Sequence, residues 1–375
     1  MAGVCGKFVS KKVRNVSWRP VVQESFQSSN AFVLGSWDDE ENSLSLWTIK
    51  NKDDKNENNQ NDIVPKMIDE IPHLGDVTDL KFMNSECLVA SSSTGSVSLY
   101  KLRRNQKFEE INSWKSVHSL ECTGIAVQNN EICTVGEDGK INIINSNSNQ
   151  ISSIENADSC TITSVMYIKH HEIITTNVRG QLKSWDIRSR SNTPSRNFFL
   201  SGDQTSLLCL NCHPTQSHVV ATGGEDGMLC VWDVRQDSHP VSLLSCHESA
   251  ITDVKFHPTS PDNLFTCSLD GSVWHWNGSS LKLKSATLPG VKIPGKLHNH
   301  IMLEMKNTNT YSYLYFLETK NECVWLNCDA TKHRLDITSL LPHSYKPINC
   351  LDVNNDRILC GSDSEVVYII DNIIV

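Results

Sequence analysis

The segment GGEDGMLCVWD, residues 223–233, decides the fold of this chain. A turn that ends in glycine precedes a short apolar run, and the run ends in Trp-Asp. The same order returns in CSLDGSVWHWN (267–277), VGEDGKINIIN (135–145) and NVRGQLKSWD (177–186). Asp-Gly between two apolar runs is a strong hairpin signal, because glycine accepts positive φ without a steric penalty. The chain therefore repeats one β-hairpin several times.

The repeat has a nearly constant length. The glycines that end the turns lie 41 to 47 residues apart, at Gly95, Gly139, Gly180, Gly227 and Gly271. A period of roughly 40–45 residues with a Trp-Asp ending is the signature of the WD repeat, which forms one four-stranded blade of a β-propeller. We therefore predict an all-β fold, a seven-bladed WD40 β-propeller closed by the N-terminal strand.

A single propeller accounts for residues 1–375. The predicted blades lie near residues 13–69, 77–111, 122–154, 161–200, 206–244, 250–341 and 348–372. The last repeat ends without an outer strand, so we expect residues 7–9 to supply this strand and to close the ring. Closure removes the exposed edges of the sheets.

Two segments interrupt the repeat. The Asn-rich stretch 50–62 has no hydrophobic periodicity and is predicted to be a disordered loop. Residues 278–332 separate two repeats and are interpreted as an insertion. The alternative is an eighth, decayed blade formed by residues 311–318 and 322–327.

One repeat carries the four polar side chains that WD repeats join by hydrogen bonds. They are His247, Thr266, Asp270 and Trp276. Such a network satisfies buried polar groups and holds the hairpin in place. We predict that these four residues form a structural tetrad in the sixth blade. The third repeat has His118, Thr134 and Asp138, but Ile144 replaces the tryptophan.

The composition narrows the class of protein. The 375 residues include 34 Lys and Arg against 43 Asp and Glu, a formal net charge of −9, and 38% are hydrophobic. This balance argues against direct binding to nucleic acid, which favours a basic surface. No run approaches the roughly 18 apolar residues of a membrane span, and no signal core is present, so we expect an intracellular protein without membrane insertion. The 14 cysteines are scattered singly, as in a reducing compartment.

No motif of an enzyme, cofactor or metal site is convincing. Cys209, Cys212 and His213 match the haem-attachment pattern, but they lie on a repeated strand and we interpret them as packed. The candidate metal ligands have spacings that fit no zinc pattern. They are His298, His300, Cys323, Cys328 and His333. We therefore predict no enzymatic activity, no catalytic residues, no cofactor and no metal.

Beyond the general repeat, an ordered set of segments resembles one family. The segments are KFVSKKVRNVSWRP (7–20), LGSWDDEENSLSLW (34–47), VGEDGKIN (135–142), ATGGEDGMLCVWDVRQ (221–236), PVSLLSCHES (240–249), LFTCSLDGSVWHW (264–276) and RLDITSLLP (334–342). In this order they resemble the forty-three-kilodalton WD-repeat nucleoporin family of the Y-shaped outer-ring complex of the nuclear pore. The resemblance covers most of the chain.

The resemblance implies a non-enzymatic scaffold subunit. The expected partners are other nucleoporins of the Y-shaped complex, including an α-solenoid subunit of its short arm, so the chain is expected to work as a hetero-oligomer. The family also implies pore assembly, nucleocytoplasmic transport of protein and mRNA, and a mitotic role in chromosome segregation. The expected locations are the nuclear pore complex in the nuclear envelope and, in mitosis, the kinetochore.

Candidate partner-binding residues come from two patterns. Trp37, Trp114 and Trp274 lie outside the repeated tryptophan position, and aromatic side chains often anchor interfaces. Arg188 and Arg235 end two WD-x-R motifs. Such motifs are similar to those of substrate receptors of a cullin-based ubiquitin ligase, in which the arginine contacts the adaptor. A substrate receptor of this ligase is the alternative to the predicted nucleoporin function.

Overall fold

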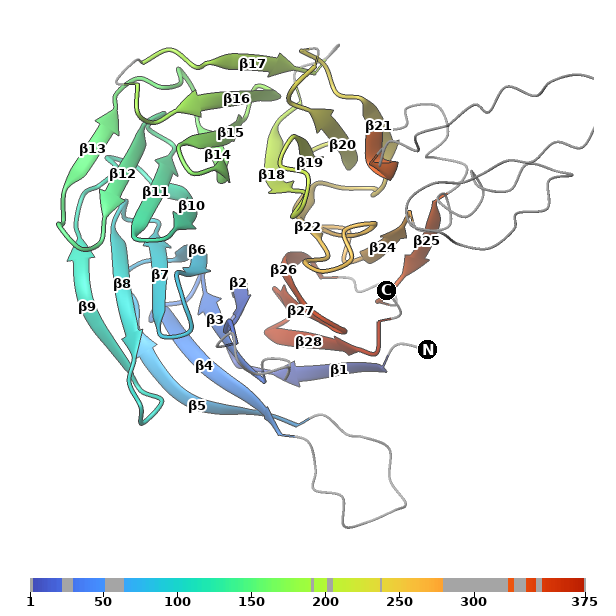
Figure 1. The fold of residues 1–375 in the computed structure, drawn as a ribbon. Helices are drawn as coiled ribbons and strands as arrows, with labels where there is room; N and C mark the ends of the chain where they lie inside the picture. Colours follow the sequence, from blue (N-terminus) through green and yellow to red (C-terminus); the bar gives the residue numbers. More distant parts are fainter. Residues whose placement is uncertain are drawn as a thin grey trace, which may run out of the picture.

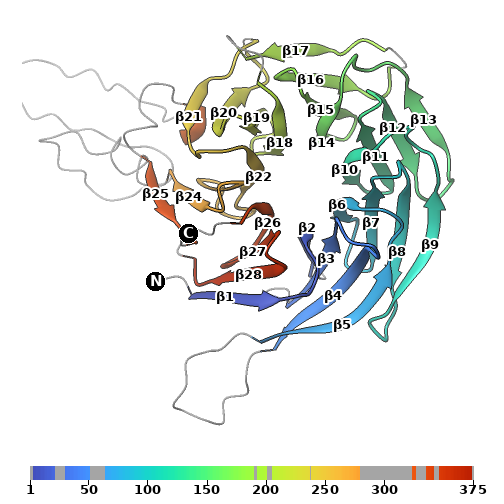
Figure 2. The ribbon, with the colours of Figure 1, turned by 180° about the vertical axis from the view of Figure 1, so that it is seen from behind.

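Strands build almost the whole described structure, which is a computed structural model. It describes residues 3–21, 30–50, 64–189, 192–200, 205–236, 238–278, 323–326, 335–341 and 346–373. Within these ranges the strands form seven four-stranded sheets, arranged as the blades of a ring (Figures 1 and 2). The predicted seven-bladed WD40 β-propeller is confirmed, with the N-terminal strand completing the last blade.

Each of the first three blades runs from an innermost to an outermost strand in chain order. The first contains β2 (Val13–Trp18), β3 (Ala31–Ser36), β4 (Ser43–Lys50) and β5 (Val64–Pro72). The second contains β6 (Val77–Phe82), β7 (Cys87–Ser92), β8 (Val97–Leu102) and β9 (Phe108–Trp114). The third contains β10 (Cys122–Gln128), β11 (Glu131–Gly136), β12 (Ile141–Asn145) and β13 (Ile151–Ile154).

Blades four to six repeat this order. The fourth contains β14 (Ile162–Lys169), β15 (Glu172–Asn177), β16 (Gln181–Asp186) and β17 (Arg196–Phe199). The fifth contains β18 (Leu207–Cys212), β19 (Val219–Gly224), β20 (Met228–Asp233) and β21 (Ser242–Ser245). The sixth contains β22 (Ile251–Phe256), β23 (Asn263–Ser268), β24 (Val273–Asn277) and β25 (Asp336–Ser339).

The seventh blade combines the two ends of the described chain. It contains β26 (Ile348–Asn354), β27 (Arg357–Ser362), β28 (Val366–Asp371) and β1 (Gly3–Phe8). β1 pairs antiparallel with β28 from Gly3 opposite Asp371 to Phe8 opposite Val366, and the two ends lie close together in Figure 1. The closing strand therefore begins earlier than the predicted residues 7–9. Its first residues, GVCG, lack the apolar pattern by which a strand is recognised.

The turn glycines behave as their spacing predicts. All five have positive φ, from 68° at Gly139 to 82° at Gly271. Four of them, Gly95, Gly139, Gly180 and Gly227, also lie against backbone of the loop that leads into the next blade: a Cβ on Gly227 would lie 2.3 Å from the carbonyl oxygen of His247. Glycine is required twice at this position, by conformation and by space.

The hydrophobic core is divided among the interfaces between blades. One cluster joins Leu229 of the fifth blade to Ile251 and Trp276 of the sixth. The tryptophans of the repeated position, Trp185, Trp232 and Trp276, are each buried to within 2% of full burial. Each blade therefore stabilises its neighbours, and no blade has a core of its own.

Two sequence predictions fall mainly outside the described ranges. Residues 51–63 are not described, so the loop predicted for 50–62 lies outside them apart from the end of β4. Of the predicted insertion, 278–332, the structure describes Gly278 and residues 323–326. There the short 3-10 helix η1 (Val324–Leu326) buries Trp325 in the cluster between the fifth and sixth blades, and its indole donates to the carbonyl of Pro261 at 2.9 Å.

Candidate protein-binding surfaces

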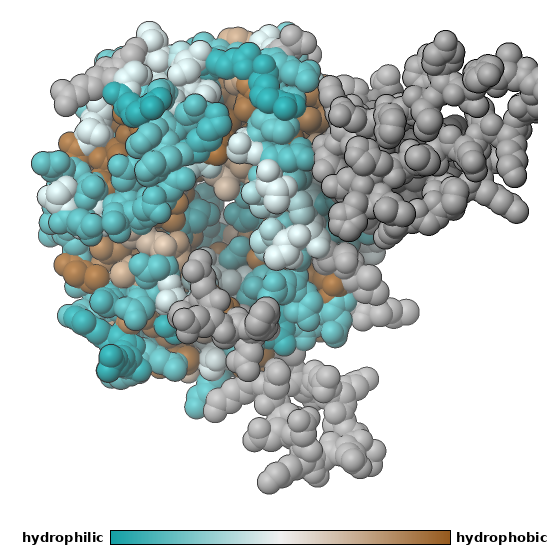
Figure 3. Space-filling view, in the orientation of Figure 1, coloured by the Kyte–Doolittle hydropathy of each residue, from teal (hydrophilic) through white to brown (hydrophobic). Residues whose placement is uncertain are grey.

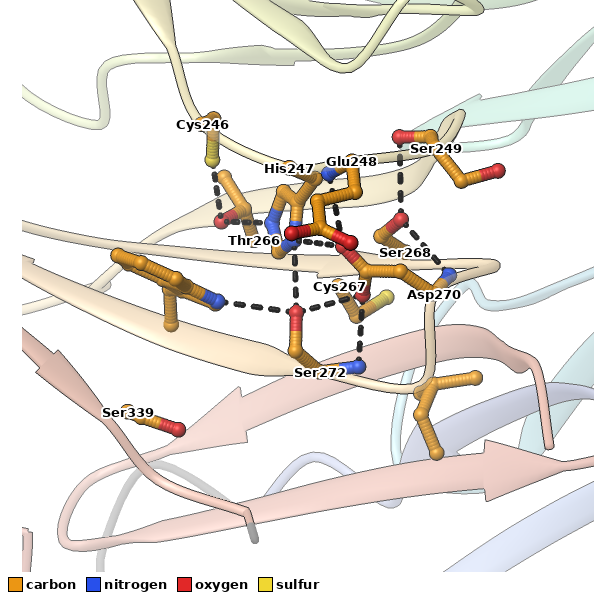
Figure 4. A network of polar contacts seen from close by, with 12 residues as sticks. Cys246, His247, Glu248, Ser249, Thr266, Cys267, Ser268, Asp270, Ser272 and Ser339 are labelled. Atoms are coloured by element: carbon orange, nitrogen blue, oxygen red, sulfur yellow. Dashed lines mark hydrogen bonds and ion pairs between the residues drawn. The ribbon is translucent and has the colours of Figure 1, made fainter. Parts of the chain in front are cut away.

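The four side chains of the sixth-blade tetrad lie in hydrogen-bond contact. His247, from the loop before β22, reaches Thr266 on β23 through Nε2 at 2.9 Å and Asp270 in the hairpin turn through Nδ1 at 3.2 Å (Figure 4). Trp276 on β24 donates from Nε1 to the same Thr266 hydroxyl at 3.1 Å. Two strands and a loop are thereby joined through one hydroxyl group.

The network also determines the state of the imidazole. Nδ1 of His247 faces the Asp270 carboxylate and, at 2.8 Å, the Ser272 hydroxyl, so this nitrogen carries the proton and Nε2 accepts from Thr266. Burial lowers the pKa of His247, and the charge of Asp270 opposes this only in part. The side chain is therefore a neutral, buried hydrogen-bond bridge, which suits a structural role.

Two other blades use variants of this network. In the third, His118 bridges Thr134 and Asp138 at 2.9 Å each, although Ile144 takes the place of tryptophan. In the fourth, Asp158 occupies the place of histidine and accepts from Lys183 at 2.7 Å. This ion pair is largely buried, with side chains 14% exposed for Lys183 and 3% for Asp158.

A ring of hydrogen bonds between blades lies around the axis, and the sequence analysis did not find it. Near the start of each innermost strand, a side chain donates to a backbone carbonyl of the next blade. The bonds run from Asn15 to Thr78, Thr78 to Cys122, Thr123 to Ile162, Thr163 to Leu207, Cys209 to Ile251, Thr252 to Ile348 and Asn349 to Val13. In five of the seven blades the donor is a Thr or Asn at the second position of the strand, which was the available signal; in the first and fifth blades it is the third residue, Asn15 and Cys209.

A channel runs through the centre of the ring. The innermost strands surround a cavity of about 690 Å³. Its lining contains charges of both signs in pairs: the Lys81 ammonium lies 3.4 Å from the Asp79 carboxylate, and the Lys255 ammonium lies 3.5 Å from the Asp253 carboxylate. Burial lowers the pKa of Lys255, but Asp253, Asp352 and Asp79 outweigh this effect and the net shift is upward. The channel therefore contains paired charges and presents no uniform potential to an ionic ligand.

Trp37 is partly exposed, as is Trp274, whereas Trp114 is buried. It follows β3, and its indole donates to Asp363 of the seventh blade at 3.1 Å. The guanidinium of Arg14 lies 5.0 Å from its ring, within cation–π range. Trp37 therefore bridges the first and seventh blades, while part of its ring remains open to solvent.

Trp114 and Trp274 are held within the fold. Trp114 ends β9 and is 8% exposed, in the cluster between the second and third blades. Trp274 is half-buried, stacks on Trp276 with ring centroids 6.2 Å apart, and donates to Ser272 at 2.9 Å. A partner would reach little of the Trp114 ring without movement of the blade.

The two WD-x-R arginines are exposed but paired. Arg188 and Arg235 each form two hydrogen bonds to the aspartate two residues earlier, Asp186 and Asp233, at 2.6–3.0 Å. Their side chains are 65% and 57% exposed. This pairing orders each arginine within its own turn, and the guanidinium groups remain within reach of a partner.

The candidate cofactor and metal residues fall into no site. Cys209 and Cys212 are buried on opposite faces of β18, in different clusters, so the two thiols do not converge on one ligand. Burial raises the pKa of Cys212 to about 12. Of the candidate metal ligands only Cys323 is described, and in the described ranges no three His, Cys, Asp or Glu side chains are grouped to hold a metal. Those ranges also hold no helix of a length and hydropathy suited to crossing a bilayer.

The outer rim of the ring exposes single apolar side chains. The outermost strands contribute Val4, Phe8, Val64, Met67, Ile111, Ile151, Phe199, Leu243 and Ile337. On the face seen in Figure 3, hydrophobic residues form small separate patches among hydrophilic ones. The geometry thus offers contact surfaces for proteins, and within the described ranges it shows no cluster arranged for catalysis.

Comparison with known proteins shows the family to which the chain belongs. The family model described as "WD domain, G-beta repeat" matches residues 194–233 and 238–277. "Nucleoporin Nup43" of Homo sapiens is 39% identical over 98% of this chain and 98% of its own length. This chain belongs to the Nup43 nucleoporin family. The resemblance stated from the sequence segments is therefore confirmed.

Other Nup43 relatives extend the comparison. "Nucleoporin Nup43" of Mus musculus is 40% identical, again over 98% of both chains. "Nuclear pore complex protein nup43" of Dictyostelium discoideum is 23% identical over 66% of this chain and 53% of its own length. The mammalian matches include every blade of the ring, so the family assignment applies to the whole propeller and not to single repeats.

Proposed function

We propose that this chain is a non-enzymatic scaffold subunit of the nuclear pore, within its Y-shaped outer-ring complex. The observation that carries the proposal is the alignment with the human and mouse nucleoporins over 98% of both chains. Its partners are other nucleoporins, including an α-solenoid subunit of the short arm. Its cellular role is to support pore assembly and the transport of protein and mRNA, with a mitotic role at the kinetochore.

The architecture supports a scaffold role on physical grounds. The blades are joined by shared clusters and by the ring of side-chain hydrogen bonds, so the binding surfaces exist before a partner arrives. A preorganised surface loses little conformational entropy on docking, and more of the interaction energy therefore appears as affinity. Trp37, which joins the first and seventh blades, is a candidate contact on this surface. The exposed arginines of the WD-x-R turns are candidate contacts for the adaptor in the alternative receptor function.

Affinity purification of the tagged full chain tests the proposal. We expect stoichiometric recovery of Y-complex nucleoporins, identified by mass spectrometry. Recovery of a cullin-ligase adaptor in their absence would contradict the proposal and support the receptor function. Charge reversal at Arg188 and Arg235 separates the two functions further: loss of nucleoporins is not expected, whereas an adaptor held by the WD-x-R arginines would be lost.

A further inference from the structure

An open groove lies where the ring closes. It runs between β1 of the seventh blade and β4 and β5 of the first, with a volume of about 430 Å³. Its apolar lining includes Phe8, Leu34, Trp47 and Met67, and its charged lining is Lys7, Lys11, Lys12, Lys66 and Glu70. We call it the seam groove. It borders the seventh blade, in which the two ends of the described chain meet.

The groove exists because β1 does not fill the space between the blades. Four of the other outermost strands each insert a large buried apolar side chain, namely Phe108 on β9, Ile154 on β13, Phe198 on β17 and Leu244 on β21, whereas β25 has no buried residue. β1 has no buried residue either. The residues of β1 that line the groove are Lys7 and Phe8, at the end of the strand that leads to the first blade.

The groove is positively charged on an acidic protein. Four lysines and one glutamate line it, whereas the whole chain has a net charge of −9. Lys11 is paired with Glu70 at 3.0 Å, and a hydrogen bond from Ser43, together with Lys11, lowers the pKa of that carboxyl. Among the described residues, Lys7 and Lys66 have no acidic partner. Two ammonium groups are thus available to an incoming carboxylate.

Apolar side chains are exposed beside these lysines. Phe8 is 61% exposed and Met67 is 46% exposed, on opposite sides of the groove. Trp47 and Leu34 form a buried apolar floor between them. Large apolar side chains open to water next to unpaired charges are characteristic of a surface that a partner covers.

We propose that the seam groove docks an extended acidic segment of a partner protein, with one or more large apolar side chains placed between Phe8 and Met67. The carboxylates pair with Lys7 and Lys66. This proposal rests on the proposed scaffold function, which supplies the partner. Because the bound segment contacts both the first and the seventh blade, it holds the ring closed and stabilises the folded state by mass action.

A direct binding experiment tests the occupant. The probe is a short fluorescein-labelled peptide in which aspartate and glutamate alternate with phenylalanine and leucine; the comparison peptide has lysine at every acidic position. We expect the full-length chain to bind the acidic peptide, with an affinity that falls as salt rises, and to melt at a higher temperature in its presence. Equal binding of the basic peptide would overturn the proposal.

Two variants test the location. K7E combined with K66E is expected to weaken binding of the acidic peptide about tenfold or more, because two attractions become repulsions. M67E tests the apolar contact of the peptide with Met67 and is also expected to weaken binding of the acidic peptide. The matched control is I111E with K115E on the outer rim of the second blade, where the isoleucine is 51% exposed, and it should leave binding unchanged. Circular dichroism confirms that each variant is folded.

Two further outcomes keep the proposals separate. Binding to phosphatidylserine vesicles that depends on Lys7 and Lys66, without binding of the acidic peptide, would overturn the peptide proposal in favour of a lipid surface. A wild-type chain that binds the acidic peptide but recovers no nucleoporin would support the groove and contradict the scaffold function. A chain that recovers nucleoporins but does not bind the acidic peptide would support the scaffold function and contradict the groove proposal.

Discussion

At the scale of single residues, Thr266 provides the hydroxyl that joins two other members of the tetrad. Its oxygen accepts from the indole of Trp276 and its proton is donated to Nε2 of His247. Thr222 in the fifth blade has the same indole contact, with Trp232 at 2.9 Å, but among the described residues no imidazole bonds to it. The two threonines therefore allow a comparison between a hydroxyl that bonds to both an indole and an imidazole, which we call a hub, and a hydroxyl that bonds to an indole without an imidazole.

Replacing Thr266 with valine keeps the side-chain shape and removes both hydrogen bonds. We expect T266V to lower the free energy of unfolding by on the order of 2 kcal/mol, because two buried polar groups lose their partner. T222V should cost about 1 kcal/mol, since a single indole is affected. Urea unfolding of both variants measures the difference. An equal cost in the two blades would contradict the role of Thr266 as a hub.

A second residue-scale prediction concerns pH. Burial, and then the nearby His257, lower the pKa of His275 to about 4, whereas a histidine in the unfolded chain titrates near 6.5. Between these values the unfolded state binds more protons, so the free energy of unfolding falls as pH drops from about 6.5 to 4. We expect H275Q to lose part of this acid sensitivity in urea unfolding at about pH 7.5 and pH 5. The exposed His170, changed to Gln, is the control and should behave as wild type.

At the scale of the blade, the fourth shows that one structural task can be met by different chemistry. Asp158 takes the place of the histidine and is held by Lys183 and by Asn177, whose amide donates at 2.8 Å. Burial raises the pKa of Asp158, but these two donors outweigh it and the net shift is downward. The fourth blade thus depends on a charged pair where the third and sixth blades depend on a buried imidazole.

Removing one member of this pair should be costly. We expect K183M to lower the free energy of unfolding by about 3 kcal/mol, because an unpaired carboxylate is left buried. Adding D158N should recover much of the loss, since it removes the charge. K140M, which breaks the exposed pair of Lys140 with Glu155 in the third blade, should have no measurable effect. If urea or thermal unfolding shows that K183M loses no more stability than K140M, the structural role of the buried pair is contradicted.

At the scale of the whole molecule, stability depends on closure. The seventh blade takes its outermost strand from the opposite end of the described chain. From the same blade, Asn349 donates to the carbonyl of Val13 in the first blade at 2.9 Å. Because each hydrophobic cluster belongs to two blades, opening one boundary exposes surface on both sides. The ring is therefore expected to unfold cooperatively and not blade by blade.

Deletion of residues 1–12 tests closure directly. The deletion removes β1 and its pairing with β28, so we expect a lower melting temperature and a broader calorimetric transition. Deletion of residues 1 and 2 alone leaves β1 in place and is the control. A melting curve unchanged by the longer deletion would show that the other contacts between the first and seventh blades are sufficient to hold the ring.

Much of the fold was predictable because its signals are local. Turn glycines, apolar runs and the repeated tryptophan follow from hydrogen-bonding and steric rules within a few residues. The partner-binding candidates were less predictable: Trp114 carries the same aromatic character as Trp37, yet it is buried by packing against the third blade. No local pattern distinguishes an exposed tryptophan from one that a neighbouring blade covers.

The amino-acid sequence by itself determined the repeat and the family, because these depend on periodic residues close together in the chain. It favoured seven blades and left an eighth open as the alternative. The tertiary structure alone decided where a partner has room. The seam groove arises where Lys7 and Phe8 of β1 face β4 and β5 of the first blade, and the ring of side-chain bonds joins residues of successive blades. Both depend on how far apart packed blades lie, a distance that no single segment specifies.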